Sequence, residues 1–168
     1  EAGSTIEVLP SGSGVVLASG TTDGTGNFTV NVPFAPDGTY QAEARATDAA
    51  GNTGSRSSAY TIIVDTVAPS APVITGPALT ATATPSVVGT AEANSTVEIL
   101  ESGSVIGTGA ANGVGAFSIT VSTLTEAAHT LRARATDAAG NTSSNSAPFT
   151  GTVDLTAPSA PSITAPAD

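Results

Sequence analysis

Two identical loops offer a carboxylate, an amide oxygen and backbone carbonyls close together in the sequence, and these groups could bind a cation. The sequence Ala-Thr-Asp-Ala-Ala-Gly-Asn-Thr occupies residues 46–53 and returns unchanged at residues 135–142. The acid and amide positions of the two loops are Asp48, Asn52, Asp137 and Asn141. Hard oxygen donors of this kind are the ligands that Ca²⁺ prefers. Asp, Gly and Asn are also frequent in tight turns, so a purely structural role for the loops stays open.

The loops belong to a tandem repeat that covers nearly the whole chain. The loop that begins at Ala46 returns at Ala135, 89 residues later, in a chain of 168 residues. Residues 1–9 match residues 92–100 at an offset of 91, so the first copy carries two extra residues near Gly14, in a turn. We therefore expect several small domains. The expected divisions are residues 1–64, a repeat that lacks its first strands; residues 65–153, a complete repeat; and residues 154–168, a linker and the first strand of a following repeat.

Alternating apolar and polar residues predict short β-strands in each copy. One aromatic and two β-branched residues alternate in both copies, as Phe28, Val30 and Val32 and again as Phe117, Ile119 and Val121. Asp23-Gly24 and Asn112-Gly113, which precede these runs, predict β-hairpins. Short strands with frequent turn signals predict an all-β fold, built as tandem immunoglobulin-like β-sandwiches. Tyr40 lies where such sandwiches often have a tyrosine corner, and His129 takes its place in the second copy.

Acidic residues are expected to gather where one domain joins the next. If successive strands alternate in direction, the loops at Glu92 and Asp137 lie at the end of the domain that the linker residue Asp65 approaches. The predicted junction ligands are Asp65, Glu92, Asp137 and Asn141, with Glu1, Asp48 and Asn52 as the first copy's set and Asp154 as the counterpart of Asp65. Clustered carboxylates repel unless a divalent cation neutralises them, so the sequence predicts Ca²⁺ there. The alternative is that these are ordinary turn, capping and solvated residues.

The composition narrows the classes of partner and of chemistry. Fourteen carboxylates against four arginines give a formal net charge of −10, which argues against nucleic acid or an anionic membrane surface and favours cations. The absence of cysteine removes disulfides and thiol chemistry. His129 is the only histidine and is expected to pack or to bond at the corner, so no catalytic residue is predicted and the chain is not expected to be an enzyme. No run of residues approaches transmembrane length, and no membrane insertion is expected.

Three motifs in order resemble the bacterial immunoglobulin-like repeats of giant Gram-negative surface adhesins and biofilm-associated proteins. They are the linker Asp-Thr-Val-Ala-Pro-Ser-Ala-Pro at 65–72, the loop Ala-Glu-Ala-Asn-Ser-Thr-Val at 91–97 and the repeated Asp-Ala-Ala-Gly-Asn loop. The resemblance implies a cell-surface stalk of many sandwiches, secreted by a type I system, with Ca²⁺ bound at the junctions by Asp65, Glu92, Asp137 and Asn141. The implied partners are neighbouring repeats of the same chain. An ion held between domains would stiffen the array and support cell adhesion and biofilm formation.

Two other functions stay open at this point. A glycan- or protein-binding module would need an exposed aromatic platform, whereas the tyrosines and most phenylalanines fit alternating core positions, with Phe34 at a loop edge. A filament subunit could be completed by strand addition from another copy of the protein, because residues 1–64 hold no counterpart of the strands predicted at 73–74 and 85–89.

Overall fold

A computed structural model describes residues 1–33 and 36–162 of the chain. The chain divides into two compact units between Thr66 and Val67, here called unit 1 and unit 2, and each is described by itself. Over the described residues, no helix has the length and apolar character needed to cross a membrane. Phe34 and the strand predicted at Ile163 lie outside the described residues.

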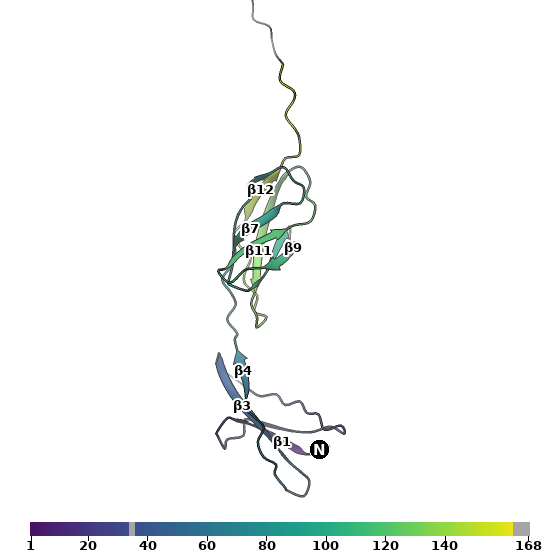
Figure 1. The fold of residues 1–168 in the computed structure, drawn as a ribbon, viewed down its shortest axis with the longest axis vertical. Helices are drawn as coiled ribbons and strands as arrows, with labels where there is room; N and C mark the ends of the chain where they lie inside the picture. The colour runs from purple at the N-terminus through teal and green to yellow at the C-terminus, as the bar shows by residue number, and fades with distance from the viewer. Residues whose placement is uncertain (34–35, 163–168) are drawn as a thin grey trace, which may run out of the picture. The chain divides into compact units, whose positions relative to one another are not determined.

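Unit 2 is a β-sandwich (Figure 1). Its described residues form a three-stranded sheet with the order β10-β7-β5 and a five-stranded sheet with the order β6-β12-β11-β8-β9. All neighbouring strands are antiparallel except β6 and β12, which are parallel. The strands are β5 (Val73–Gly76), β6 (Leu79–Thr80), β7 (Ser86–Thr90), β8 (Thr96–Glu101), β9 (Ser104–Ala110), β10 (Ala116–Thr120), β11 (Ala128–Thr136) and β12 (Phe149–Val153). The all-β sandwich predicted for the second repeat is confirmed.

The core of unit 2 lies between its two sheets, and the alternation of side chains along each strand creates it. Inward residues of both sheets are buried in one cluster, which includes Ile74, Val87, Val97, Ile99, Phe117, Ile119, Leu131 and Ala133. Gly89 on β7 lies directly opposite Phe117 on β10. A Cβ atom at Gly89 would lie 2.5 Å from the Phe117 ring and 2.1 Å from the carbonyl oxygen of Val73. Only glycine fits there, because β5 and the aromatic ring approach the β7 backbone from two sides.

Unit 1 repeats one of the two sheets (Figure 1). Its strands are β1 (Thr5–Pro10), β2 (Ala18–Thr21), β3 (Gly38–Thr47) and β4 (Tyr60–Val64), in the order β2-β1-β3-β4. The order matches β9-β8-β11-β12 of unit 2, and so does the register, since Thr5 pairs with Thr47 as Thr96 pairs with Thr136. Over its described residues, unit 1 contains this sheet and no second sheet.

Two of the predictions for strands and turns are wrong. Residues 27–32 form no strand in unit 1, although their counterparts form β10, because the described part of unit 1 contains no strand like β7 to pair with them. Phe28 is accordingly 46% exposed, whereas Phe117 is 4% exposed. The Asn112-Gly113 turn is not a hairpin within a sheet. It connects β9 of one sheet to β10 of the other, because the apolar faces of both strands must point into the same core.

The close approach at Gly89 leads to a stability prediction. The Gly89→Ala substitution should destabilise unit 2 by about 3 kcal/mol, because the methyl group meets a backbone carbonyl that cannot rotate away. Gly113→Ala is the matched control, since a Cβ there would lie 4.0 Å from its nearest neighbour, Asn94 Oδ1. Thermal unfolding followed by the amide NMR signals of β11 measures both variants. Equal midpoints for the two would contradict the packing described for Gly89.

Candidate functional site

The repeated loops fold through hydrogen bonds to their aspartates. Asp137 Oδ1 accepts bonds from the backbone N–H groups of Ala139 and Asn141, both at 2.9 Å, and Oδ2 accepts one from Asn141 Nδ2 at 2.9 Å. Asp48 receives the same three bonds in unit 1, from Ala50 N, Asn52 N and Asn52 Nδ2. In both loops the side-chain amide four residues on is the main cause that lowers the pKa of the aspartate, so the carboxylate form is favoured.

A carboxylate is not required for this kind of turn. Asn112 Oδ1 accepts bonds at 3.0 Å from the N–H groups of Val114 and Ala116, with the same two- and four-residue spacing. Asp23, the counterpart of Asn112 in unit 1, accepts the equivalent pair from Thr25 and Asn27. One acceptor oxygen therefore closes the turn. The second oxygen and the negative charge of Asp48 and Asp137 exceed what the backbone needs.

Three loops of unit 2 lie at one end of its larger sheet. Thr96 pairs with both Ala110 and Thr136, so the loops that precede β8, follow β9 and follow β11 share that end. These are the loops of Glu92, Asn112 and Asp137, as the alternating strand directions predicted. Glu92 is exposed, and Asp137 is half-buried. In unit 1 the pairing of Thr5 with Thr21 and Thr47 places Glu1, Asp48 and Asn52 at the corresponding end.

Acidic residues also lie at the opposite end of each unit, where its last strand leaves. Asp65 follows β4, and the neighbouring Asp37 accepts bonds from Thr66 N at 3.1 Å and Thr66 Oγ1 at 2.8 Å. In unit 2 the matching contact joins Thr156 Oγ1 to Glu126 Oε1 at 2.6 Å, and Asp154 Oδ1 accepts from Thr156 N at 3.1 Å. The predicted ligand set does not include this second acid, since Asp37 lies in a Pro-Asp-Gly sequence that is typical of a plain turn. The signal was its recurrence as Glu126, 89 residues later.

The predicted metal site stays a prediction. Within each unit, the described residues bring no three His, Cys, Asp or Glu side chains together as a metal-binding group. The residues assigned to the junction belong to both units, Asp65 to unit 1 and Glu92, Asp137 and Asn141 to unit 2. Their carboxylate and amide oxygens are of the type that Ca²⁺ takes. At Asp137, Oδ1 serves two backbone bonds and Oδ2 a single side-chain amide, so Oδ2 is the oxygen that a cation would compete for.

At the predicted tyrosine-corner position, a side chain contacts the carbonyl four residues earlier in both copies. The side chain is a tyrosine in unit 1 and a histidine in unit 2. The Tyr40 hydroxyl donates to the carbonyl of Pro36. At the matching position, His129 Nε2 lies 3.0 Å from the carbonyl oxygen of Thr125, and Nδ1 lies 2.7 Å from Glu101 Oε1. The ring is buried. The bond to Thr125, followed by that to Glu101, raises the pKa of His129 above its ordinary value, because both partners accept from the protonated ring.

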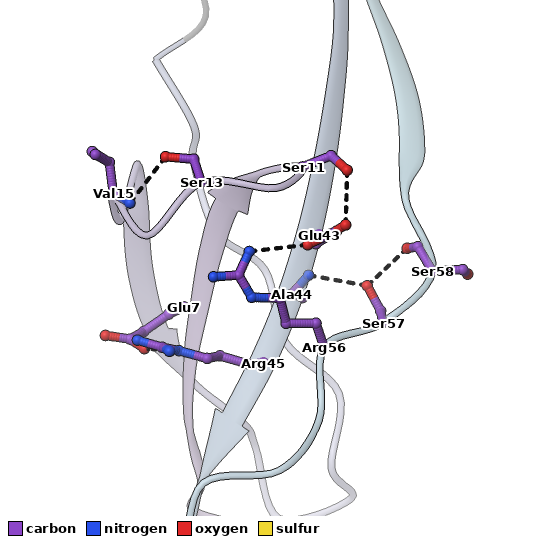
Figure 2. A network of polar contacts seen from close by, with 10 residues as sticks. All are labelled: Glu7, Ser11, Ser13, Val15, Glu43, Ala44, Arg45, Arg56, Ser57 and Ser58. Atoms are coloured by element: carbon purple, nitrogen blue, oxygen red, sulfur yellow. Dashed lines mark hydrogen bonds and ion pairs between the residues drawn. The ribbon is translucent and has the colours of Figure 1, made fainter.

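The four arginines are held by glutamates or by a backbone carbonyl of the same unit. Figure 2 shows Glu43 between the Ser11 hydroxyl, at 2.8 Å, and the Arg56 guanidinium, at 3.1 Å. Arg45 pairs with Glu7 at 2.6 Å, and its counterpart Arg134 pairs with Glu98 at 2.5 Å. Arg132 instead donates to the carbonyl of Ser146 at 2.7 Å. Arg45, Arg132 and Arg134 lie on strands, and Arg56, between β3 and β4, contacts a glutamate of β3.

The two-sheet architecture of unit 2, its corner bond and its repeat in unit 1 define an immunoglobulin-like sandwich protein. Residues 68–152 match the family model of a bacterial Ig domain, and residues 1–66 match that of a bacterial Ig-like domain. The chain therefore belongs to the bacterial immunoglobulin-like domains. No curated protein matches it.

Solved structures show the same kind of fold. The fibronectin(III)-like modules of CbhA from Clostridium thermocellum are 19% identical, with a TM-score of 0.57 over 90% of this chain and 78% of theirs. Domains FN1–FN3 of chicken CNTN1 are 12% identical, with a TM-score of 0.54 over 90% of this chain and 55% of theirs. A biofilm associated protein (BSP domain) is 29% identical over 94% of this chain, with a TM-score of 0.43. This chain spans about a quarter of that protein, 26% of its length.

The contact between His129 and Glu101 should make the stability of unit 2 depend on pH. Because the folded-state pKa lies above the ordinary value of 6.5, the stabilisation is fully present below pH 6.5 and is lost as the pH rises through the raised value. His129→Tyr restores the residue of the first copy and should remove this loss. Thermal midpoints of unit 2, read from β11 amide signals on both sides of neutral pH, test the difference. A wild-type protein and variant that change in parallel would contradict it.

Proposed function

We propose that this chain is a stalk segment of a larger bacterial cell-surface protein, in which successive immunoglobulin-like units act as spacers. The observation that carries the proposal is the back-to-back arrangement of two family matches, at residues 1–66 and 68–152, on a strict internal repeat. The sheet that both units contain has the same strand order, register and loop bonding in the two copies. Repetition of whole structural units extends a chain without adding a new site to each unit.

The proposed function is mechanical and non-enzymatic. The one histidine serves the corner of unit 2, and three of the four arginines pair with glutamates on the strands. Each of these groups is engaged in structural contacts. A secreted, surface-exposed location and a role in adhesion and biofilm formation are part of this proposal.

The location can be tested on cells. Antibodies raised against the purified chain should label intact cells of the bacterium that encodes it, because a stalk must project beyond the outer surface. Antibodies against a cytoplasmic protein of the same cells provide the control for lysis. Labelling that appears only after the cells are permeabilised would overturn the surface assignment.

We further propose that Ca²⁺ binds at the junction of two successive units. The ligands would be Asp65, from the end of one unit where its last strand leaves, and Glu92, Asp137 and Asn141, from the end loops of the next. The support is chemical: the backbone of the turn needs one oxygen of Asp137, as Asn112 shows for its own turn, so a cation would compete only with the Asn141 side-chain amide for the second oxygen. The bound ion would supply positive charge that offsets the repulsion among the carboxylates. In unit 1, the residues equivalent to Glu92, Asp137 and Asn141 are Glu1, Asp48 and Asn52. In unit 2, the residue equivalent to Asp65 is Asp154.

The cation proposal predicts a change in length. In millimolar Ca²⁺ the chain should show a larger maximum dimension by small-angle X-ray scattering than in EDTA, because an ion that bridges the two units removes bending freedom. Asp137→Asn should abolish the difference while leaving the turn folded, since an amide oxygen accepts the same two backbone bonds at Asn112.

The control for that measurement is a carboxylate away from the loops. Glu98→Gln removes a charge that is paired with Arg134 on the strands and should leave the Ca²⁺ response intact. A wild-type chain whose maximum dimension is the same in Ca²⁺ and EDTA would refute the cation bridge. It would leave the stalk proposal to be decided by surface labelling.

A further inference from the structure

The loop between β10 and β11 holds the segment through which the chain leaves unit 2, residues 154–157, here called the exit segment. The Glu126 carboxylate accepts a bond from Thr156 Oγ1 at 2.6 Å, and the carbonyl of Ala127 accepts one from Val153 N at 2.9 Å. Val153 is the last residue of β12, directly before the exit segment. The position of the loop therefore determines how firmly the exit segment is attached to unit 2.

His129 holds the same loop from the other side. The carbonyl oxygen of Thr125, the residue directly before Glu126, lies 3.0 Å from Nε2 of the ring. Nδ1 lies 2.7 Å from Glu101 Oε1 on β8. The two ring nitrogens thus face a carbonyl and a carboxylate, and neither of these groups donates when the carboxylate is ionised. Only a positively charged ring, with a proton on each nitrogen, satisfies both contacts.

The other surroundings of the His129 ring leave its charge to be set by Glu101. The ring is buried and borders a cavity of unit 2. Among the described residues that line this cavity with it, from β6, β7, β11, β12 and the connecting loops, no other is titratable. The nearby acids of the loop and the exit segment, Glu126 and Asp154, accept bonds from Thr156. Arg132, on the same strand as the ring, donates to a backbone carbonyl.

A neutral ring has one proton and must give up one of the two contacts. A hydrogen bond to an ionised acceptor is roughly twice as strong as one to a neutral acceptor, so the proton stays on Nδ1, opposite Glu101. Nε2 then directs a lone pair at the carbonyl oxygen of Thr125, and the two repel each other. Loss of a proton from His129 therefore frees the loop at the residue next to Glu126.

Unit 1 has the same arrangement with a tyrosine at the corner. The Tyr40 hydroxyl donates to the carbonyl of Pro36, and the adjacent Asp37 accepts two bonds from Thr66. The acid is one methylene shorter than in unit 2, and the threonine is one residue closer to the strand before it. Both copies thus attach the segment that follows their last strand, but a tyrosine hydroxyl makes the corner contact as a neutral group.

We propose that His129 is a proton-operated switch for the exit segment of unit 2. The doubly protonated ring holds the loop between β10 and β11 and, through Glu126 and Ala127, the exit segment. Loss of one proton releases the loop and loosens the exit segment. In the stalk proposed above, on which this consequence rests, the linker after a repeat with histidine at the corner loosens at a pH at which the linker after a repeat with tyrosine stays attached.

The test is NMR spectroscopy of the full chain, with the ring nitrogens of His129 and the backbone amides followed from below pH 6.5, the ordinary pKa of histidine, to well above it. Above the His129 midpoint the ring should show the tautomer with its proton on Nδ1. The amide signal of Thr156 should shift with the same midpoint. Amide exchange at Val153, measured relative to its counterpart Val64 in unit 1, should rise by about fivefold, the effect of one lost hydrogen bond.

Two variants on β8 separate the switch from a general effect of charge on stability. Glu101→Gln removes the ionised acceptor, and its amide can donate to an unprotonated Nδ1. The neutral ring then keeps its proton on Nε2 and its contact with Thr125, so the responses of Val153 and Thr156 to pH should disappear. Glu98→Gln is the matched control on the same strand, since it removes a carboxylate that is paired with Arg134, and it should leave both responses unchanged.

Three outcomes would overturn the proposal. The first is a neutral ring in the wild-type chain with its proton on Nε2, because the loop would then keep its contact. The second is a ratio of exchange at Val153 and Val64 that is the same across the range of pH in which the chain is folded. The third is a response to pH that persists in Glu101→Gln. None of these results affects surface labelling, so failure of this inference is distinguishable from failure of the stalk proposal.

Discussion

The structure depends on one constraint, which is that a β-sheet with an apolar face must be covered by a second layer. In unit 2 the cover is tight: Gly89 allows the Phe117 ring and the carbonyl of Val73 to approach the same backbone position. The strands that form this cover come from both sides of β8 in the sequence, since β5 and β7 precede it and β10 follows it after β9. The second sheet of a repeat therefore needs strands from before β8 and from after β8 in the sequence. Phe28 is 46% exposed in unit 1, whose described residues contain no strand like β7.

Comparison of equivalent positions in the two copies distinguishes the side-chain groups that the fold requires from those that it does not. The turn after β2 or β9 uses Asp23 in one copy and Asn112 in the other, so a single acceptor oxygen is enough there. The corner uses a tyrosine in one copy and a histidine in the other, so the requirement is a polar group that reaches a carbonyl four residues earlier. Asp48 and Asp137 are the same in both copies although an asparagine could close the turn. The retained negative charge, which the turn does not require, is the physical reason to propose a role besides folding for the Asp137 loop.

The sequence predicted the elements that depend on neighbouring residues and on the repeat itself. The sandwich of unit 2 and the corner at Tyr40 follow from alternation and turn chemistry, and both are present. The strand predicted at Phe28 failed because β-structure requires a ladder partner, which alternation cannot reveal. The bond between Asp37 and Thr66 was missed because it joins residues 29 positions apart, across a contact that only the folded sheet creates.

The distribution of charge differs between the sheets and the end loops of each unit. Glu7, Glu43 and Glu98 are each paired with an arginine on the strands. The end loops contain aspartates and glutamates and no lysine or arginine: Arg45 and Arg56, on either side of the Asp48 loop in the sequence, pair with Glu7 and Glu43 instead. The linker at 65–72 follows the end of unit 1 that holds Asp37 and Asp65, and it leads to β5 of unit 2, whose Val73 pairs with Thr90 close to the Glu92 loop. Monovalent salt screens such charges beyond about 8–10 Å, but carboxylates closer than that repel unless a cation lies between them. A divalent ion at a junction would therefore act on both spacing and stiffness, whereas salt alone would act only on the long-range part of the repulsion.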